Sequence, residues 1–425
     1  MYQTKKITYS QNSKEDLFRC TILCLLFPPF ISSIFAFYKF LHYKSRSFGI
    51  LFFVFFVLFL TYNFFSVDNS LRYFAANDIE DSFSWLTKDP LTIIMAYGKE
   101  IGLESSLFFY IYILATYIIW LSCYTNCKET KTINKIDIMI VISSMILRNA
   151  MDLLYYTLSL STLLFLVSRK EKINLKDYLY IIPLIFILHP GVLFFLLPSI
   201  GLYYILNSST KRRNNIVYFL YLGGVYIASA LITHISIPTT GIAIIDTLNA
   251  SFNHYTNNEN KWGIRTTELS GITFFIQYYV ISFFYAIIFI ITLYKRDRIK
   301  QKFILAIFQI AFIMLPNFWN FVTLSERLLV ALSLTSCLCI VMLIQTKAIN
   351  IRLKYIAWIY IFIFSFNLFR ATRMELSGVF KNKSYNEIVL HSYYVPSILL
   401  FDYQSWGFSN KFIESNSLFK YFFNR

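Results

Sequence analysis

Apolar runs of roughly 17–25 residues follow one another along most of this chain, and they constrain its fold more than any other feature. Their length matches the ~20 residues with which an α-helix crosses a membrane, and exceeds the ~10-residue alternating strands of a transmembrane barrel. Only 15% of the residues are charged, against about 25% in a typical soluble domain. The sequence therefore predicts an all-α, polytopic bundle that spans the lipid bilayer, with residues 1–425 as a single integral-membrane domain.

The runs predict about twelve transmembrane helices. We expect one helix each at 18–41, 48–66, 107–126, 216–236, 270–294 and 355–369, and two shorter helices each within 136–168, 178–206 and 303–345. Two polar loops, 67–106 and 237–269, and a tail, 370–425, complete the chain. Loops of this length are usually functional, so we expect the first and second loop to contribute to a site. The polar N-terminal residues lack the pattern of a cleavable signal peptide.

The formal net charge of +16 follows the predicted topology. Basic residues gather in alternate short segments between the runs, where they outnumber those of the other segments by about three to one. Such segments lie on the cytoplasmic side of a membrane, and this distribution argues against nucleic acid as a partner. Twelve helices place both termini outside. If Pro28 and Pro29 make the first run re-entrant, eleven spans remain and the N-terminus lies inside.

A short polar segment, residues 148–152, interrupts the apolar segment 136–168. It contains Arg148 and Asp152, and the basic segments on either side place it at the outer tip of a helical hairpin. Charges at membrane depth are costly, so they suggest a functional site. An i,i+4 ion pair that serves only to neutralise itself is the structural alternative.

Several charged residues share the predicted outer side with this tip. They are Arg72, Asp78, Asp81, Arg148, Asp152, His189, Arg265, Glu326 and Arg327. Guanidinium groups bind phosphates in a bidentate manner, and a carboxylate or a histidine can take a proton from a hydroxyl. That combination suits the transfer of a sugar chain from a lipid diphosphate. Each residue also has a structural interpretation, as a solvated loop charge, a helix cap or one half of a local ion pair.

The six cysteines lie within or at the ends of apolar runs, with no histidine or carboxylate near them in a ligand pattern. We therefore expect core or lipid-facing thiols, no metal and no other cofactor.

Four short motifs, in order along about two-thirds of the chain, resemble the Wzy/EpsG-type polysaccharide polymerases, which are related in architecture to GT-C glycosyltransferases. The sequence Leu-Arg-Tyr at 71–73 is followed by Asp78, and Phe83 stands where an aromatic residue is usual. Arg148 opens the fifth predicted helix, His189 begins His-Pro-Gly-Val-Leu, and Arg327 precedes a leucine at the start of helix eleven.

The resemblance implies a metal-independent polymerase in the bacterial inner (cytoplasmic) membrane. Its donor is a glycan on undecaprenyl diphosphate, its acceptor is a lipid-linked repeat unit, and a chain-length regulator protein is the expected partner. In this interpretation Arg72, Arg148 and Arg327 hold the diphosphate, and His189 or Asp78 is the base. Arg265, Asp81, Asp152 and Glu326 are further candidate binding residues because of their predicted outer position. Two alternatives remain: another GT-C-like transferase such as an O-antigen ligase, and a flippase or exporter without catalysis.

Overall fold

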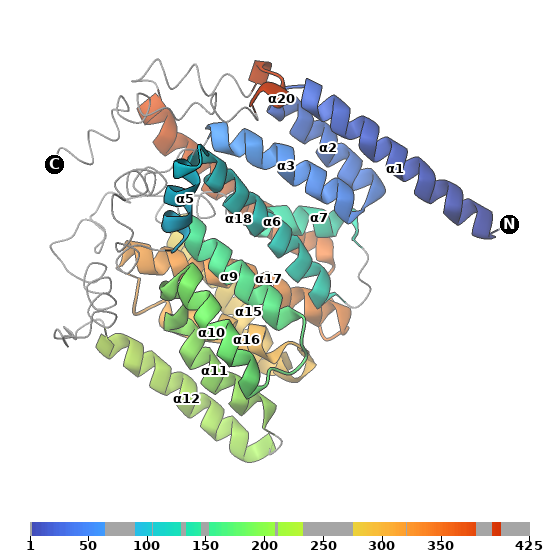
Figure 1. Cartoon of the computed structure of the whole chain (residues 1–425). Coiled ribbons are helices and arrows are strands. Elements are labelled where there is room, and N and C mark those ends of the chain that lie inside the picture. Colours follow the sequence, from blue (N-terminus) through green and yellow to red (C-terminus); the bar gives the residue numbers. More distant parts are fainter. Residues whose placement is uncertain are drawn as a thin grey trace.

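The computed structural model describes residues 2–63, 90–103, 105–128, 133–145, 153–208, 211–232, 275–319, 321–379 and 393–400. Within these ranges every regular secondary-structure element is a helix, which confirms the predicted all-α class (Figure 1). The helices are α1 (Tyr2–Leu26), α2 (Pro29–Tyr43), α3 (Arg46–Asn63), α5 (Pro90–Glu100), α6 (Ser105–Cys127), α7 (Lys135–Ser144), α9 (Leu154–Ser168), α10 (Leu175–Leu188), α11 (Leu193–Asn207), α12 (Lys211–Ile232), α15 (Ile281–Lys295), α16 (Lys302–Met314), α17 (Val322–Gln345), α18 (Leu353–Val379) and α20 (Ser397–Leu400).

Three helices of the described part are long and apolar enough to cross a membrane. They are Leu107–Cys127 in α6, Asn215–Ile232 in α12 and Leu324–Gln345 in α17. Several others are apolar but shorter, such as α9 with 15 residues and α16 with 13, whereas a full crossing takes about 20. The predicted number of twelve spans is therefore not confirmed.

The first apolar run forms a hairpin of α1 and α2, and the prediction of a single helix over 18–41 is wrong. Pro28 lies between the two helices and Pro29 opens α2. A proline suits the first turn of a helix, but its ring clashes with a preceding turn and it cannot donate a backbone hydrogen bond. The legs are antiparallel: Ser32 Oγ donates to the carbonyl of Cys24 at 2.7 Å, and Lys39 Nζ lies 3.3 Å from Asp16.

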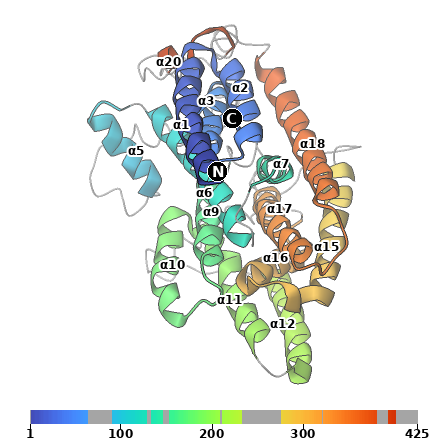
Figure 2. The same cartoon turned by 90° about the vertical axis from the view of Figure 1, so that its right-hand side faces the viewer.

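The central helix is α17, with 89% of its apolar window buried inside the protein. It packs against α6, α7, α9, α15 and α16 (Figure 2). Buried hydrogen bonds join three of these helices. Trp120 Nε1 of α6 donates to the carbonyl of Val141 in α7, and Ser333 Oγ of α17 donates to the carbonyl of Ser144 in α7 at 2.8 Å. In contrast, α12 lies at the periphery, where only 17% of its apolar window is buried.

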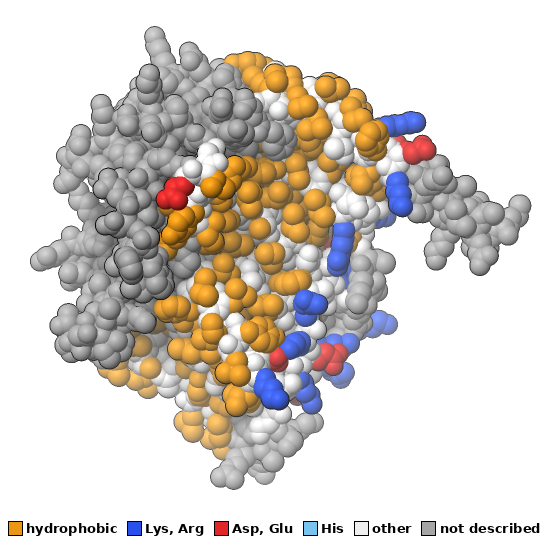
Figure 3. All heavy atoms as spheres, in the orientation of Figure 1, with side chains coloured by type: hydrophobic (Ala, Val, Ile, Leu, Met, Phe, Trp, Pro, Cys, Tyr) orange, Lys and Arg blue, Asp and Glu red, His pale blue; other side chains and the backbone are white. Residues whose placement is uncertain are grey.

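The basic segments meet at one end of the helices, which we call the basic end. Arg46 at the start of α3 donates to Thr125 Oγ1 near the end of α6 at 2.8 Å. Asn126 at the end of α6 and Gln301 before α16 both donate to Ser168 at the end of α9. Figure 3 shows Lys and Arg side chains along one edge, beside a broad hydrophobic face. The basic segments that the structure describes therefore lie together at one end of the helices.

Two other boundaries differ from the predictions. The last long helix, α18, continues to Val379, ten residues into the predicted tail. Residues 370–377 contain no proline or glycine that would end the helix earlier. The predicted first loop, 67–106, contains the helix α5, which begins at Pro90, a residue favoured in the first turn.

Candidate functional site

His189 lies at a break between two helices, as its sequence context predicts. The α10 helix ends at Leu188, and His189 adopts an extended conformation with φ −167° and ψ 108°. Pro190 follows, and a proline disfavours a helical conformation in the residue before it. The backbone N–H of Gly191 donates to Nδ1 of His189 at 3.1 Å. Because Nδ1 accepts this hydrogen bond, the neutral ring carries its proton on Nε2.

Arg327 lies in the second turn of α17 and meets the same break. Gly191 lies between the two side chains: a Cβ added there would be 2.8 Å from Cε1 of His189 and 3.2 Å from Nη1 of Arg327. Both side chains are half-buried. The structure thus brings together two predicted residues that are far apart in the sequence.

Tyr156 of α9 joins His189 and Arg327. Its hydroxyl donates to the carbonyl of Arg327 at 2.8 Å, and its ring centroid lies 5.7 Å from the guanidinium carbon. The edge-to-face contact with the His189 ring has a centroid distance of 5.6 Å and an interplanar angle of 87°. Tyr156 is 1% exposed. We call His189, Gly191, Arg327 and Tyr156 the histidine–arginine cluster.

Sequence reasoning did not select Tyr156. The signal available was modest: α9 is apolar and buried around most of its circumference, and a buried tyrosine hydroxyl usually finds a polar partner. Nothing in the sequence shows that this partner is the backbone of Arg327, because the two residues belong to different helices.

The cluster lies at the end of the helices opposite the basic end. Arg327 and Gln345 are both in α17, and 18 residues of α-helix span about 27 Å. His189 follows the C-terminus of α10, whose first turn lies in the basic segment after α9. The cluster therefore places a permanent cation and an imidazole N–H, both half-buried, at the end predicted to be outside.

The chemistry of the histidine–arginine cluster favours an anion. An arginine side chain keeps its charge and presents a planar fork that matches phosphate oxygens. The Tyr156 ring holds this fork by a cation–π contact. In the tautomer described above, His189 is a donor through Nε2, whereas the sequence left it as a possible base.

Among the other predicted residues, the structure describes one, Glu326. Glu326 is half-buried on α17, but it is turned about 100° around the helix axis from Arg327. Six candidates lie outside the described residues: Arg72, Asp78, Asp81, Arg148, Asp152 and Arg265. The loop 237–269 also lies outside them.

The cysteines agree with the sequence interpretation, since all six are buried and none forms a disulfide. Among the described residues, no group of three His, Cys, Asp or Glu side chains converges as a metal site would require.

No protein-family model, curated protein or solved structure matches this chain.

Proposed function

We propose that this chain is a membrane glycosyltransferase that polymerises lipid-linked oligosaccharide repeat units at the outer face of a bacterial cytoplasmic membrane. The observation that supports this proposal most is the meeting of His189 and Arg327 around Tyr156, at the end opposite the basic end. A half-buried guanidinium and an imidazole donor suit a diphosphate leaving group, whose negative charge increases as the sugar departs.

In the proposed reaction, a hydroxyl of the acceptor repeat unit attacks the anomeric carbon of the donor glycan. The new bond joins that carbon to the acceptor oxygen, and the bond between the carbon and the diphosphate oxygen breaks. The electron pair stays on the undecaprenyl diphosphate, which Arg327 and the Nε2–H of His189 stabilise. Asp78 takes the hydroxyl proton as general base, and Arg72 and Arg148 hold the diphosphate with Arg327.

The proposed membrane arrangement has eleven spans, with the α1–α2 hairpin re-entrant. The N-terminal leg of this hairpin then shares the cytoplasmic side with the basic end, because Asp16 of α1 contacts Lys39 and Tyr43 near the end of α2. This arrangement also puts Lys14 and Arg19 on the side where positive charge is normally retained.

A deletion strain tests the proposal, complemented with the wild type or with Arg327→Ala, Arg327→Lys or His189→Ala. Surface polysaccharide is separated on a gel, and lipid-linked intermediates are quantified. We expect the deletion and Arg327→Ala to abolish long polymer while single lipid-linked units persist. Arg327→Lys is expected to restore little long polymer, because the lysine ammonium lacks the planar, bidentate donor pair of the guanidinium group. Lys354→Ala, at the basic end, is the control variant.

The same strain distinguishes the alternatives. Accumulation of long polymer on its lipid carrier would identify a ligase in place of a polymerase. Normal polymer length with Arg327→Ala, at wild-type protein levels, would contradict the proposed role of the histidine–arginine cluster.

A further inference from the structure

The segment that joins α15 to α16, residues 295–302, concentrates positive charge at the basic end. It contains five basic residues and one acidic residue, which gives a net charge of +4. Four of the basic residues form no ion pair with any residue that the structure describes, and we call them the cationic cluster: Lys295, Arg296, Arg298 and Lys302. In contrast, Lys39, Lys128 and Lys170 at the same end each contact a carboxylate.

Arg296 connects the cationic cluster to α12. Its Nη2 donates to Oδ1 of Asn215 near the start of α12, and its guanidinium carbon lies 4.8 Å from the centre of the Tyr218 ring. A guanidinium has five N–H donors, so the bond to Asn215 leaves further donors for a ligand. The α12 helix itself begins with the sequence Lys-Arg-Arg at 211–213, which adds three positive charges to this end of the protein.

Exposed apolar side chains adjoin the cationic cluster on two helices. On α12, Ile216, Phe219 and Leu220 are each more than half exposed, and on α15 the same holds for Ile290 and Tyr294. Both helices pack against α16. Cations next to exposed apolar side chains complement an amphiphile with an anionic headgroup, whereas a soluble anion uses the cations alone.

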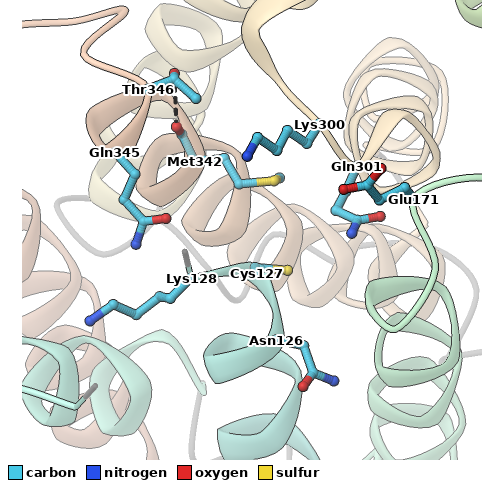
Figure 4. A pocket seen from close by; sticks show the side chains of 9 residues that line it. All are labelled: Asn126, Cys127, Lys128, Glu171, Lys300, Gln301, Met342, Gln345 and Thr346. Carbon is cyan, nitrogen blue, oxygen red and sulfur yellow. Dashed lines mark hydrogen bonds between the residues drawn. The ribbon is translucent and has the colours of Figure 1, made fainter. Parts of the chain in front are cut away.

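The cavity at the basic end has a different lining. It has a volume of about 170 Å³ and lies beside the ends of α6 and α17 (Figure 4). Asn126, Glu171, Lys300 and Gln301 all line it, so it offers both signs of charge and both hydrogen-bond donors and acceptors. This mixed lining does not select a ligand by charge, whereas the cationic cluster selects an anion.

From this complementarity we propose that the cationic cluster binds the headgroup of an anionic phospholipid of the phosphatidylglycerol type. The phosphate oxygens face Arg296 and Arg298, because guanidinium groups bind phosphate in a bidentate manner. Lys295 and Lys302 add positive charge around them, and the acyl chains lie along the exposed apolar faces of α12 and α15. The bound lipid fastens the peripheral helix α12 to the rest of the bundle. The proposal does not rest on the glycosyltransferase function, since it concerns the end opposite the histidine–arginine cluster.

The test measures lipid binding to the full-length protein in a neutral detergent. Native mass spectrometry counts the bound lipids, and thermal unfolding reports stabilisation, as phosphatidylglycerol, phosphatidylethanolamine or inorganic phosphate is added. We expect phosphatidylglycerol to bind about tenfold or more tightly than the zwitterionic lipid and to raise the unfolding temperature. Inorganic phosphate at the same concentration should have little effect, because it lacks acyl chains.

Two double variants test whether the cationic cluster is the site. Lys295→Gln combined with Arg298→Gln removes two exposed charges of the cluster, and it is expected to weaken phosphatidylglycerol binding about tenfold or more. Lys172→Gln combined with Lys176→Gln removes the same charge from exposed positions at the same end, outside the cluster. This control should retain the affinity of the wild type.

The proposal is wrong if phosphatidylethanolamine binds as tightly as phosphatidylglycerol, or if inorganic phosphate gives the same stabilisation. Equal losses of affinity in the two double variants, or no retained lipid in the wild type, would also overturn it. Arg298→Gln alone is the second variant, to be used if the first double variant does not elute as a single species.

Discussion

At the scale of single residues, Gly191 controls how closely His189 and Arg327 approach each other. An alanine methyl at this position would lie 2.8 Å from the His189 ring, so the ring has to move. Displacements of about 1 Å in a catalytic site cost up to ~100-fold in rate. We predict that Gly191→Ala lowers polymer yield about tenfold or more, measured on gels of complemented deletion strains.

Gly223 is the matched control for this substitution. It lies in α12, and an added Cβ meets nothing within 4 Å. Alanine there should raise stability by up to about 1 kcal/mol, because glycine is a poorer helix former, and polymer yield should stay at the wild-type level. Equal losses of polymer from both variants would argue against a special role for Gly191.

Tyr156 and its neighbour Tyr155 allow a second paired experiment. Tyr156→Phe removes the hydrogen bond to the carbonyl of Arg327, and Tyr155→Phe removes the contacts of its hydroxyl with Thr92 and Met95. We expect each to lower the free energy of unfolding by about 1 kcal/mol. Only Tyr156→Phe should also reduce polymer length, since only this hydroxyl touches the cluster. Unfolding in detergent and polymer gels measure the two effects.

The candidate site was predictable from the sequence in part. His189 and Arg327 stood out because a charged or titratable side chain between apolar runs is costly. Their mutual proximity was not predictable, because it depends on how α10 and α17 pack across more than a hundred intervening residues. Tyr156 was not found at all, since a tyrosine in an apolar helix has the same sequence pattern whether its hydroxyl supports a site or only the core.

At the scale of helices, α7 and α10 begin with the same device. Each has an N-cap asparagine and an aspartate three residues later that form a capping box, Asn134 with Asp137 and Asn174 with Asp177. Each aspartate also pairs with a lysine from the preceding segment, Lys128 or Lys170. In the first pair both residues are buried, whereas in the second Asp177 is buried and Lys170 is exposed. The sequence Ile-Asn-x-x-Asp occurs at both sites, and it fixes where these helices start.

The Lys170–Asp177 pair predicts a pH dependence. The hydrogen bond from Lys170 lowers the pKa of Asp177 below its ordinary value, with a further contribution from the backbone N–H of Asn174. A carboxyl with a lowered pKa stabilises the fold above its unfolded pKa, and this stabilisation is lost as the pH falls through the folded value. We predict that wild type is more stable to heat than Asp177→Asn at pH 7, and that this advantage starts to decline near about pH 4 and disappears as the pH falls through the lowered pKa of Asp177. Thermal unfolding in detergent across this range is the measurement.

The buried pair predicts a much larger effect. Lys128 and Asp137 are both buried, and Tyr124 donates to the same carboxylate at 2.8 Å. Removing one partner of a buried ion pair costs about 3–5 kcal/mol, because the other charge stays buried. Lys128→Met should therefore sharply reduce the yield of folded protein, whereas Lys170→Met should have little effect. Addition of Asp137→Leu to the first variant should recover part of the loss, and size-exclusion chromatography measures this recovery.

Most helix positions followed from the apolar runs, and the exceptions have physical causes. The breaks within 136–168, 178–206 and 303–345 were expected from polar or proline-containing interruptions, and helices end near each of them. The hairpin at Pro28–Pro29 was predicted only as an alternative, because two prolines can either bend a helix or reverse the chain. The length of α18 was underestimated, since polar residues such as those at 370–379 continue a helix as readily as they end it.

At the scale of the whole molecule, the charge separation predicts which side of the membrane each end faces. All six cysteines are buried, so a cysteine introduced at an exposed position dominates labelling by a membrane-impermeant maleimide. We predict that Glu100→Cys, at the end of α5, is labelled from outside in intact cells. Lys172→Cys, in the basic segment after α9, should be labelled only after the membrane is permeabilised. The reverse pattern would contradict the proposed orientation.

The contact between the α1–α2 hairpin and α20 has a consequence for the timing of folding. The backbone N–H and the hydroxyl of Ser397 both donate to the carbonyl of Phe27, at 2.9 and 2.6 Å, and Tyr393 packs against Phe30 and Phe59. The tip of the α1–α2 hairpin is thus completed by a residue 370 positions later in the chain. During synthesis this hairpin reaches its final packing only after that later segment has been translated.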